Sequence, residues 1–367
     1  MKTLLFGDFY PYRKDVAQLF VDADVEALFG DSLSLFEDKD FIAINLECAI
    51  TDKDTAIAKH GPNLKAPIGS ENALKKLGVN LAGLSNNHVF DFGVPGIIDT
   101  MESLKRAGID YTGFGDNYED SRKDYIFEKD GEKIAVIAVC EHEYSYAKPD
   151  KMGSRPFDEF DTLEDIRRAN AECDRVIVMY HGGKEHCRYP SPRLMRACRA
   201  MVRAGADVVL CQHTHCISCY ENYEGGHILY GQGNSHFLWP YSEECWESAL
   251  AVEYDTVSGE IDFVPLHTPN DEKECGISLA KGEERDEIMK GFAARSASLL
   301  DGTWIDGWRE FCASVENQYR RVVAKASTPE CTEKDNLQFA HYIDCEAHLD
   351  VFRELYQTLH MKDYNYW

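Results

Sequence analysis

The sequence predicts an α/β protein followed by a helical extension. Three observations carry this prediction. Short apolar strands alternate with helical segments over most of the chain, the strand signal stops near residue 268, and helical patterns fill the remainder. We therefore expect a domain over residues 1–267 and an extension over residues 268–367. A chain of 367 residues with 44% hydrophobic content can bury a core of that size and a smaller appendage.

The first elements set the order of the sheet. Residues 3–6 and 41–45 are apolar runs typical of buried strands, and residues 15–28 between them have a helical pattern. This β-α-β order predicts a parallel pair. Further strands are expected at residues 79–84, 134–140 (in a hairpin with 125–128), 175–180, 208–211, 227–230, 249–254 and 260–264, and further helices at residues 70–77, 96–107, 162–172, 192–204, 283–300, 308–326 and 336–360.

The stretch 205–215, GADVVLCQHTH, contains a candidate pair of metal ligands. A β-branched apolar run ends where His213 and His215 begin, so a strand delivers two imidazoles to a loop. Imidazole is the usual ligand for Zn, Mn or Fe at neutral pH, and a turn after a strand lets both rings converge. Two solvent-facing loop histidines are the alternative, and the motif alone does not decide between them.

The same pattern, an apolar run that ends in a metal-capable residue, recurs along the chain. In an α/β sheet, functional groups gather where the carboxyl ends of strands meet in one crevice. Oxygen and nitrogen ligands of this kind suit Mn, Fe or Zn, and two such ions would clamp a phosphoryl group. Five apolar runs end in metal-capable residues: Asp8, Glu47, Asn87 with His88, His181, and His213 with His215.

As a set, these motifs resemble those of the calcineurin-like metallophosphoesterase superfamily, and more narrowly of its bacterial capsule-synthesis branch, the CapA or poly-γ-glutamate (PGA_cap) family. The resemblance covers about residues 1 to 267 and implies a four-layer α/β/β/α sandwich. The matching residues are Gly7-Asp8, Asn45-Leu46-Glu47, Asn86-Asn87-His88 with Asp91 and Gly93, His181 with Gly183 and Glu185, Gly205-Ala206-Asp207 with His213 and His215, and Gly233-Asn234.

The resemblance also implies a role for each ligand. Asp8 and His215 would bind one metal, Glu47 would bridge two metals, and the second metal would be held by Asn87, His181 and His213. His88 looks like the histidine that protonates the leaving oxygen, with Asp91 as the partner that keeps its pKa near the working pH. A hydrogen-bonded loop histidine is the alternative for His88.

Two departures from the superfamily pattern affect the first metal. Tyr10 stands where classical phosphoesterases carry a histidine, and Glu47 stands where they carry an aspartate. Glu185 and His186 are candidates for compensating these changes or for binding substrate, and Asn86 and Arg188 are candidates for binding substrate. Arg193 is another candidate anion contact, with an ordinary surface arginine as the alternative for it and for Arg188.

Bulk properties limit the partners and the location. A formal net charge of -25 argues against nucleic acid or an anionic membrane as the main partner. Thirteen cysteines without metal-ribbon spacing are typical of reduced thiols, although Cys216 and Cys219 form a lone CxxC. The first residues have no signal-peptide core, so a soluble cytoplasmic protein is expected.

These observations predict a metal-dependent hydrolase of a phosphate ester or related bond, with two divalent ions and an anionic small-molecule or polymer substrate. Two alternatives stay open. One is a non-hydrolytic role in capsule or poly-γ-glutamate biosynthesis, and the other is a binding protein with a degenerate metal site. The C-terminal helices are expected to pack on the main domain and could form a homodimer surface.

Overall fold

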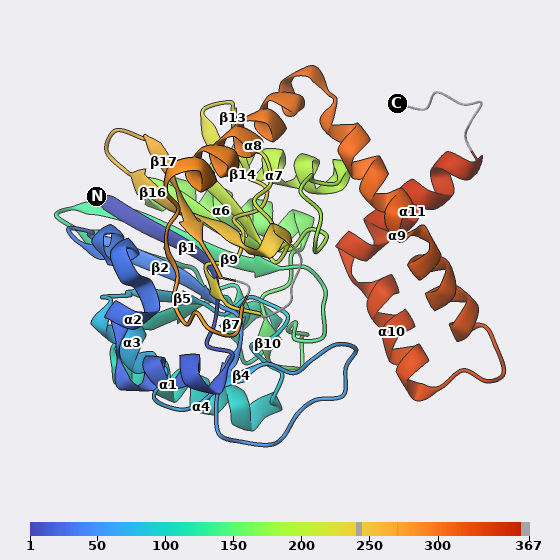
Figure 1. The fold of residues 1–367 in the computed structure, drawn as a ribbon, viewed down its shortest axis with the longest axis horizontal. Coiled ribbons are helices and arrows are strands. Elements are labelled where there is room, and N and C mark those ends of the chain that lie inside the picture. The colour runs from blue at the N-terminus through green and yellow to red at the C-terminus, as the bar shows by residue number, and fades with distance from the viewer. Residues whose placement is uncertain (240–243, 270, 361–367) are drawn as a thin grey trace.

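The structure is a computed structural model that describes residues 1–239, 244–269 and 271–360. Two sheets form the centre of the molecule (Figure 1). The first contains, in spatial order, β18 (Ser278–Leu279), β17 (Ile261–His267), β16 (Ser248–Asp255), β1 (Lys2–Tyr10), β2 (Phe41–Leu46), β5 (Leu81–Gly83) and β6 (Asp110–Thr112), with β15 (His236–Phe237) beside β1. The second contains β13 (Tyr220–Tyr223), β14 (Gly226–Leu229), β12 (Val208–Gln212), β11 (Arg175–His181), β9 (Glu132–Cys140) and β8 (Tyr125–Lys129).

The two sheets pack face to face. One buried apolar cluster joins Leu5 and Ala43 of the first sheet to Ile177 and Leu210 of the second. Two short pairs lie outside these sheets: β3 (Ala49–Ile50) with β4 (Lys65–Ala66), and β7 (Phe114–Gly115) with β10 (Gly153–Ser154). The hairpin of β8 and β9 is confirmed, since the two strands pair antiparallel.

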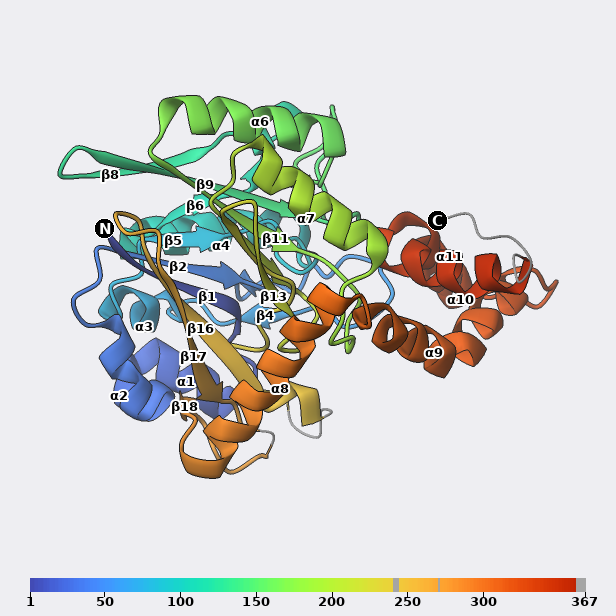
Figure 2. The ribbon, with the colours of Figure 1, turned by 90° about the horizontal axis from the view of Figure 1, so that it is seen from above.

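Helices cover the outer face of each sheet (Figure 2). On the first sheet, one apolar cluster unites α1 (Lys14–Asp22), α2 (Val25–Phe29), α3 (Glu71–Lys76) and α4 (Gly93–Ala107) with the strands, and on the second a different cluster does so for α6 (Glu159–Glu172) and α7 (Pro192–Ala204). The shorter helical turns are η1 (Gly30–Phe36), α5 (Tyr118–Ser121) and η2 (Glu244–Trp246). The predicted four-layer α/β/β/α sandwich is therefore confirmed.

The middle strands of both sheets run parallel, so their carboxyl ends gather on one side. In the first sheet β1, β2 and β5 are parallel neighbours, and in the second β9, β11 and β12 are. The register of β1 against β2 shifts between Leu5 and Asp8, and β1 continues to Tyr10. The sequence predicted that this strand would end at Phe6. The irregularity keeps Asp8 inside the strand.

Two predicted helices are each broken in two. The helix expected over residues 15–28 is interrupted at Ala23, which has a positive φ of 53°. The helix expected over residues 336–360 separates into α10 (Glu333–Asp344) and α11 (Glu346–His360), because Cys345 is extended. The Cys345 thiol lies 3.2 Å from a carboxylate oxygen of Glu143, so a contact with the sandwich accompanies this break.

The C-terminal helices divide into two groups. Helix α8 (Gly282–Asp301) packs on the sandwich, where Phe292 joins the core between the sheets. Helices α9 (Trp304–Ala326), α10 and α11 share an apolar cluster that includes Trp308, Tyr342 and Val351, and Cys187 of the sandwich joins it. In Figures 1 and 2 these three helices lie together at one side of the sandwich. No helix among the described residues has the length and apolar character needed to cross a bilayer.

Candidate metal centre

The predicted ligands meet at the carboxyl ends of four strands. Asp8 lies in β1, Glu47 follows β2, His181 ends β11, and His213 and His215 follow β12. Each of these five residues is at most 4% exposed. Side chains from opposite sheets are therefore buried together, as the strand-end argument predicts.

Ligand atoms from these residues lie close enough to share ions. Three groups each have their candidate ligand atoms within 4.8 Å of one another: Glu47 with His181 and His213, Asp8 with Glu47 and His215, and Glu185 with His213 and His215. Glu47 belongs to the first two groups, which is the arrangement required of a bridging carboxylate. Glu185 enters through the third group, although its sequence motif left its role open.

Asp8 is held in place by its neighbours on both sheets. Its Oδ1 accepts a hydrogen bond from Asn45 Nδ2 at 2.7 Å, and its Oδ2 accepts one from the His213 amide at 3.0 Å. Burial opposes ionisation, but the hydrogen bond and charge of His181 outweigh it and lower the pKa of Asp8 to about 2. Asp8 is therefore an ionised, oriented carboxylate.

Glu47 is the most informative residue of the centre. Its two carboxylate oxygens are buried, and neither has a hydrogen-bond partner among the described residues. Burial, followed by the charge of Asp8, raises the pKa of Glu47 to about 7. A buried carboxylate without partners is costly in an apoprotein, and cation ligation removes that cost. The donor set of carboxylates and imidazoles thus fits divalent metal ions.

The imidazoles are oriented by the same network. His181 Nε2 lies 3.0 Å from Asn87 Oδ1 and 3.3 Å from Glu47 Oε1. Burial opposes its charged form, but the Glu47 and Asp8 carboxylates raise the pKa of His181 to about 10. His213 and His215 have positive φ angles of 77° and 56°, a region that side chains rarely adopt outside turns and functional sites. His213 Nδ1 is buried and unpartnered among the described residues.

Glu143 also belongs to this centre, and the sequence analysis missed it. Its Oε2 accepts a hydrogen bond from Asn87 Nδ2 at 2.9 Å, and its Oε1 lies 3.3 Å from His213 Nε2. Glu143 follows β9, so a signal existed: the strand ending at Cys140 runs into acidic residues like the other strand ends. The carboxylate fixes the side chains of two predicted ligands.

His88 and Asp91 are in contact, as predicted, but a third residue joins them. His88 Nδ1 lies 2.7 Å from Asp91 Oδ2, and the Lys59 ammonium lies 3.0 Å from the same Nδ1 and 2.5 Å from Asp91 Oδ1. The sequence predicted that Asp91 would hold the pKa of His88 near working pH. Instead, burial and then the Lys59 charge lower it, despite Asp91. The Lys59 side chain is 1% exposed and lies in a segment with no periodic pattern.

Asn86 and Tyr10 lie near the centre without joining its ligands. Asn86 is fully buried, donates to Leu46 O at 2.9 Å and accepts from the Val89 amide at 2.8 Å, so its side chain is used to shape the loop rather than to face a substrate. Tyr10 packs on Phe237, with ring centroids 5.0 Å apart.

The predicted substrate-binding residues on the loop after β11 lie in different places in the structure. The ring of His186 stacks on Trp246, and His186 lines a hollow together with Glu185. Arg188 lines a different hollow of about 200 Å³ with Arg295. The Arg193 guanidinium is occupied inside the protein rather than offered to a substrate anion. It binds the Glu141 and Asp350 carboxylates and connects α7 to α11.

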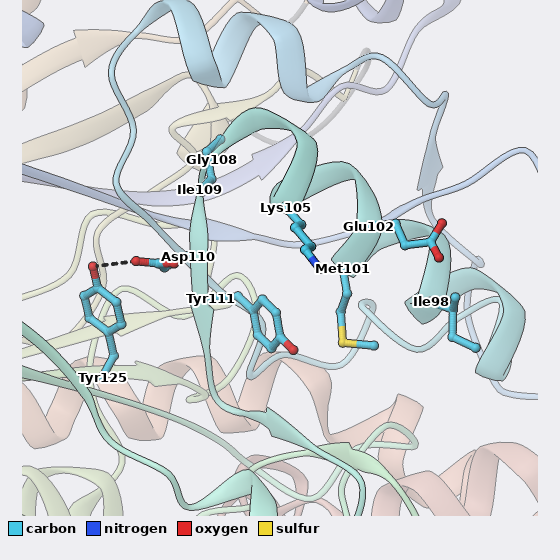
Figure 3. A pocket seen from close by; sticks show the side chains of 9 residues that line it. All are labelled: Ile98, Met101, Glu102, Lys105, Gly108, Ile109, Asp110, Tyr111 and Tyr125. Atoms are coloured by element: carbon cyan, nitrogen blue, oxygen red, sulfur yellow. Dashed lines mark hydrogen bonds between the residues drawn. The ribbon is translucent and has the colours of Figure 1, made fainter.

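A larger hollow lies far from this chemistry. It has a volume of about 650 Å³ and lies along α4 and β6 (Figure 3), where Tyr125 donates to Asp110 at 3.1 Å. Its lining includes apolar side chains such as Ile98 and Met101, and none of the candidate ligands. Size alone therefore does not locate the site.

Comparison with known proteins decides the family. The profile of the family described as "Bacterial capsule synthesis protein PGA_cap" matches residues 2–237. The chain belongs to this family. It is 29% identical over 249 residues to "Capsule biosynthesis protein CapA" of Bacillus anthracis, and 30% identical over 216 residues to "PGA biosynthesis protein CapA" of Bacillus subtilis. These matches cover 63% and 58% of this chain.

The chain spans 59% and 57% of the length of these two PGA_cap relatives. Among solved structures, it is similar to a hypothetical protein from Thermus thermophilus, with a TM-score of 0.46, 15% identity, and coverage of 73% of this chain and all of the other. The PGA_cap match ends at Phe237, so β16 to β18 and all four C-terminal helices lie beyond it.

Proposed function

We propose that this PGA_cap protein is a metal-dependent hydrolase that cleaves a phosphate ester or a related bond of an anionic substrate. The observation that carries the proposal is Glu47, whose two buried oxygens have no hydrogen-bond partner among the described residues and lie where two metal-capable groups overlap. The residues proposed to hold two divalent ions, of Mn, Fe or Zn, are Asp8, Glu47, Asn87, His181, His213 and His215.

When bound, such ions polarise a phosphoryl group and lower the pKa of a water molecule. The chain itself supplies orientation. Asn45 fixes the Asp8 carboxylate through its 2.7 Å hydrogen bond, and Glu143 fixes Asn87 and His213. Because these partners are buried and fixed before substrate arrives, little reorganisation is needed.

His88 is proposed to act on the leaving oxygen. Its Nδ1 is occupied by Asp91 and Lys59, so Nε2 is the nitrogen left for a substrate. The lowered pKa keeps the ring neutral at neutral pH. In a neutral ring that donates from Nδ1 to the Asp91 carboxylate, Nε2 is an acceptor, so His88 donates to a leaving oxygen only after Nε2 has taken up a proton.

The test is turnover of an aryl phosphate with Mn²⁺, by the full chain and by His181→Ala. We expect at least a hundredfold loss in the variant, since one ligand is removed and the Glu47 and Asp8 carboxylates lose their neighbour. A His267→Phe variant, changed at a partly exposed position on β17, is the control. Equal turnover by His181→Ala and the unmodified protein would refute the proposal.

A second function is supported by the names of the relatives, which describe capsule and PGA biosynthesis. In that function the chain would handle a capsular polymer without hydrolysing it. Incubation with poly-γ-glutamate separates the two: a shortened polymer favours hydrolysis, and metal-dependent retention of an intact polymer favours the non-hydrolytic role.

A further inference from the structure

A cavity of about 440 Å³ lies between the sandwich and helices α9 to α11. The sandwich contributes Lys184 and Glu185 from the loop after β11, together with His60. The helices contribute His341 of α10 and His348 of α11. One wall of this cavity is thus made by helices that lie beyond the part of the chain matched by the PGA_cap profile.

One residue belongs both to the cavity and to the candidate metal centre. Glu185 lines the cavity and also forms a metal-capable group with His213 and His215. It is the one acidic residue among the described lining residues. Lys184 Nζ lies 3.7 Å from it, and the Lys184 side chain is 11% exposed. A ligand in this cavity would therefore lie beside whatever the metal centre binds.

A hydrogen-bonded chain connects Tyr319, His348 and His341. Tyr319 OH lies 2.6 Å from His348 Nδ1, and His348 Nε2 lies 3.0 Å from His341 Nε2. If the phenol donates to Nδ1, then His348 donates from Nε2, and a neutral His341 accepts there and carries its proton on Nδ1. That Nδ1 is buried and has no partner among the described residues. The network leaves one N–H donor unsatisfied.

His60 is in the same situation. Gln338 Nε2 lies 3.4 Å from His60 Nε2, so the amide donates and the His60 proton is placed on Nδ1. This second Nδ1 is also buried and unpartnered within the described part of the chain. The two rings, from His60 and His341, have centroids 6.0 Å apart. The two rings and the Lys184 side chain line the same cavity.

We propose that this cavity binds an anionic, oxygen-rich group of the substrate, either a carboxylate or a phosphate, next to the metal centre. Buried N–H donors without acceptors are costly, and a ligand with several acceptor oxygens satisfies them. The volume lies in the range of small-molecule sites, roughly 300 to 1,000 Å³. The inference rests on the proposed function only in naming the ligand as substrate, because anion binding is measured separately from turnover.

The experiment is calorimetric titration of the full, Mn²⁺-loaded chain with two probes, pyrophosphate and triglutamate. The variants are His341→Phe, which keeps a ring beside Tyr144 but removes the N–H, and Lys184→Met, which keeps the length but removes the charge. We expect each to weaken probe binding about tenfold, with bound metal per chain unchanged by elemental analysis. His267→Phe is the matched control and should bind as the unmodified protein does.

The two probes distinguish the source of the anionic group. Tight binding of pyrophosphate alone assigns a phosphate, and tight binding of triglutamate alone assigns a carboxylate. Binding of neither probe at millimolar concentration overturns the proposal, as does unchanged affinity in both variants. Loss of metal together with loss of probe binding also counts against it, because the effect then belongs to the metal centre. Loss of turnover in His181→Ala tests the proposed hydrolase function and is a separate result from anion binding in the cavity.

Discussion

Replacing Glu47 by glutamine should change the stability of the metal-free and metal-loaded proteins in opposite ways. Glutamine keeps the shape of the side chain but is a poor ligand for a divalent ion. Because Glu47 belongs to two metal-capable groups, the variant loses a ligand from both. We therefore expect Glu47→Gln to lose both metal equivalents. His181 belongs to one group, so His181→Gln should lose one equivalent.

The size of the effect follows from linkage. A ligand at one hundred times its Kd stabilises the folded state by about 2.7 kcal/mol. With an unfolding entropy of about 2.1 cal/mol/K per residue over 367 residues, 1 kcal/mol shifts Tm by about 1.3 °C. Saturating one site with Mn²⁺ should thus raise Tm of the unmodified protein by about 3 to 4 °C, and should not raise that of Glu47→Gln.

Without metal, Glu47→Gln is expected not to lose stability relative to the unmodified protein. The pKa of Glu47 is raised to about 7, above its usual 4.5, so the ionised carboxylate destabilises the fold above pH 7 and the penalty disappears below pH 4.5. The full penalty is about 3 kcal/mol, a figure that already includes the favourable effect of the neighbouring His181. Metal-free Glu47→Gln should therefore be at least as stable as the metal-free unmodified protein at pH 8.

The assay is differential scanning fluorimetry of chelator-treated protein with and without Mn²⁺, together with elemental analysis. Glu128→Gln, on the exposed strand β8, is the matched control for loss of one carboxylate. The reasoning is refuted if Glu47→Gln binds two equivalents of metal and shows the Mn²⁺ shift. It is also refuted if the metal-free variant unfolds several degrees below the metal-free parent at pH 8.

Three further outcomes are expected. Lys59→Met leaves the Asp91 carboxylate buried without its cation, so urea unfolding should show a loss of about 3 kcal/mol, and an unchanged midpoint would contradict this. The Glu346 carboxylate raises the pKa of His142 despite burial, so this contact stabilises the fold fully below pH 6.5 and is lost as pH rises through the raised pKa. The difference in stability between the parent and His142→Gln, about 1 kcal/mol at pH 6, should therefore shrink by pH 9, and parallel pH curves would exclude it. Chelator should lower Tm of protein purified without chelator, and Mn²⁺ should restore it; a Tm that responds to neither would argue against a metal-stabilised fold.

The strand ends explain why the candidate ligands could be predicted from sequence. A buried strand has a strong local pattern, and the residue that follows it lies at a fixed edge of the sheet. Asp8 and His213 are therefore neighbours in space although β1 and β12 are far apart in the chain, and the His213 amide binds the Asp8 carboxylate at 3.0 Å. The four-layer arrangement followed from the same alternation together with the family resemblance.

Other parts of the site have no comparable local signal. Lys59 lies in a segment without regular secondary structure, and its place beside His88 depends on how residues 51–64 fold over the loop. His341 and His348 are seven residues apart on what looks like one helix, and in the structure their Nε2 atoms lie 3.0 Å apart across the break at Cys345. Tertiary contacts, which periodicity does not encode, decide these positions.

Helices α9 to α11 meet the sandwich through an apolar cluster that includes Cys187 and through buried polar contacts such as Arg193 with Asp350. The candidate metal ligands lie at the strand ends of the sandwich, whereas the opposite wall of the cavity is formed by these helices. If the proposed anion site is correct, exchanging the three helices between members of the family would alter which ligand the cavity accepts and would leave the candidate metal ligands unchanged.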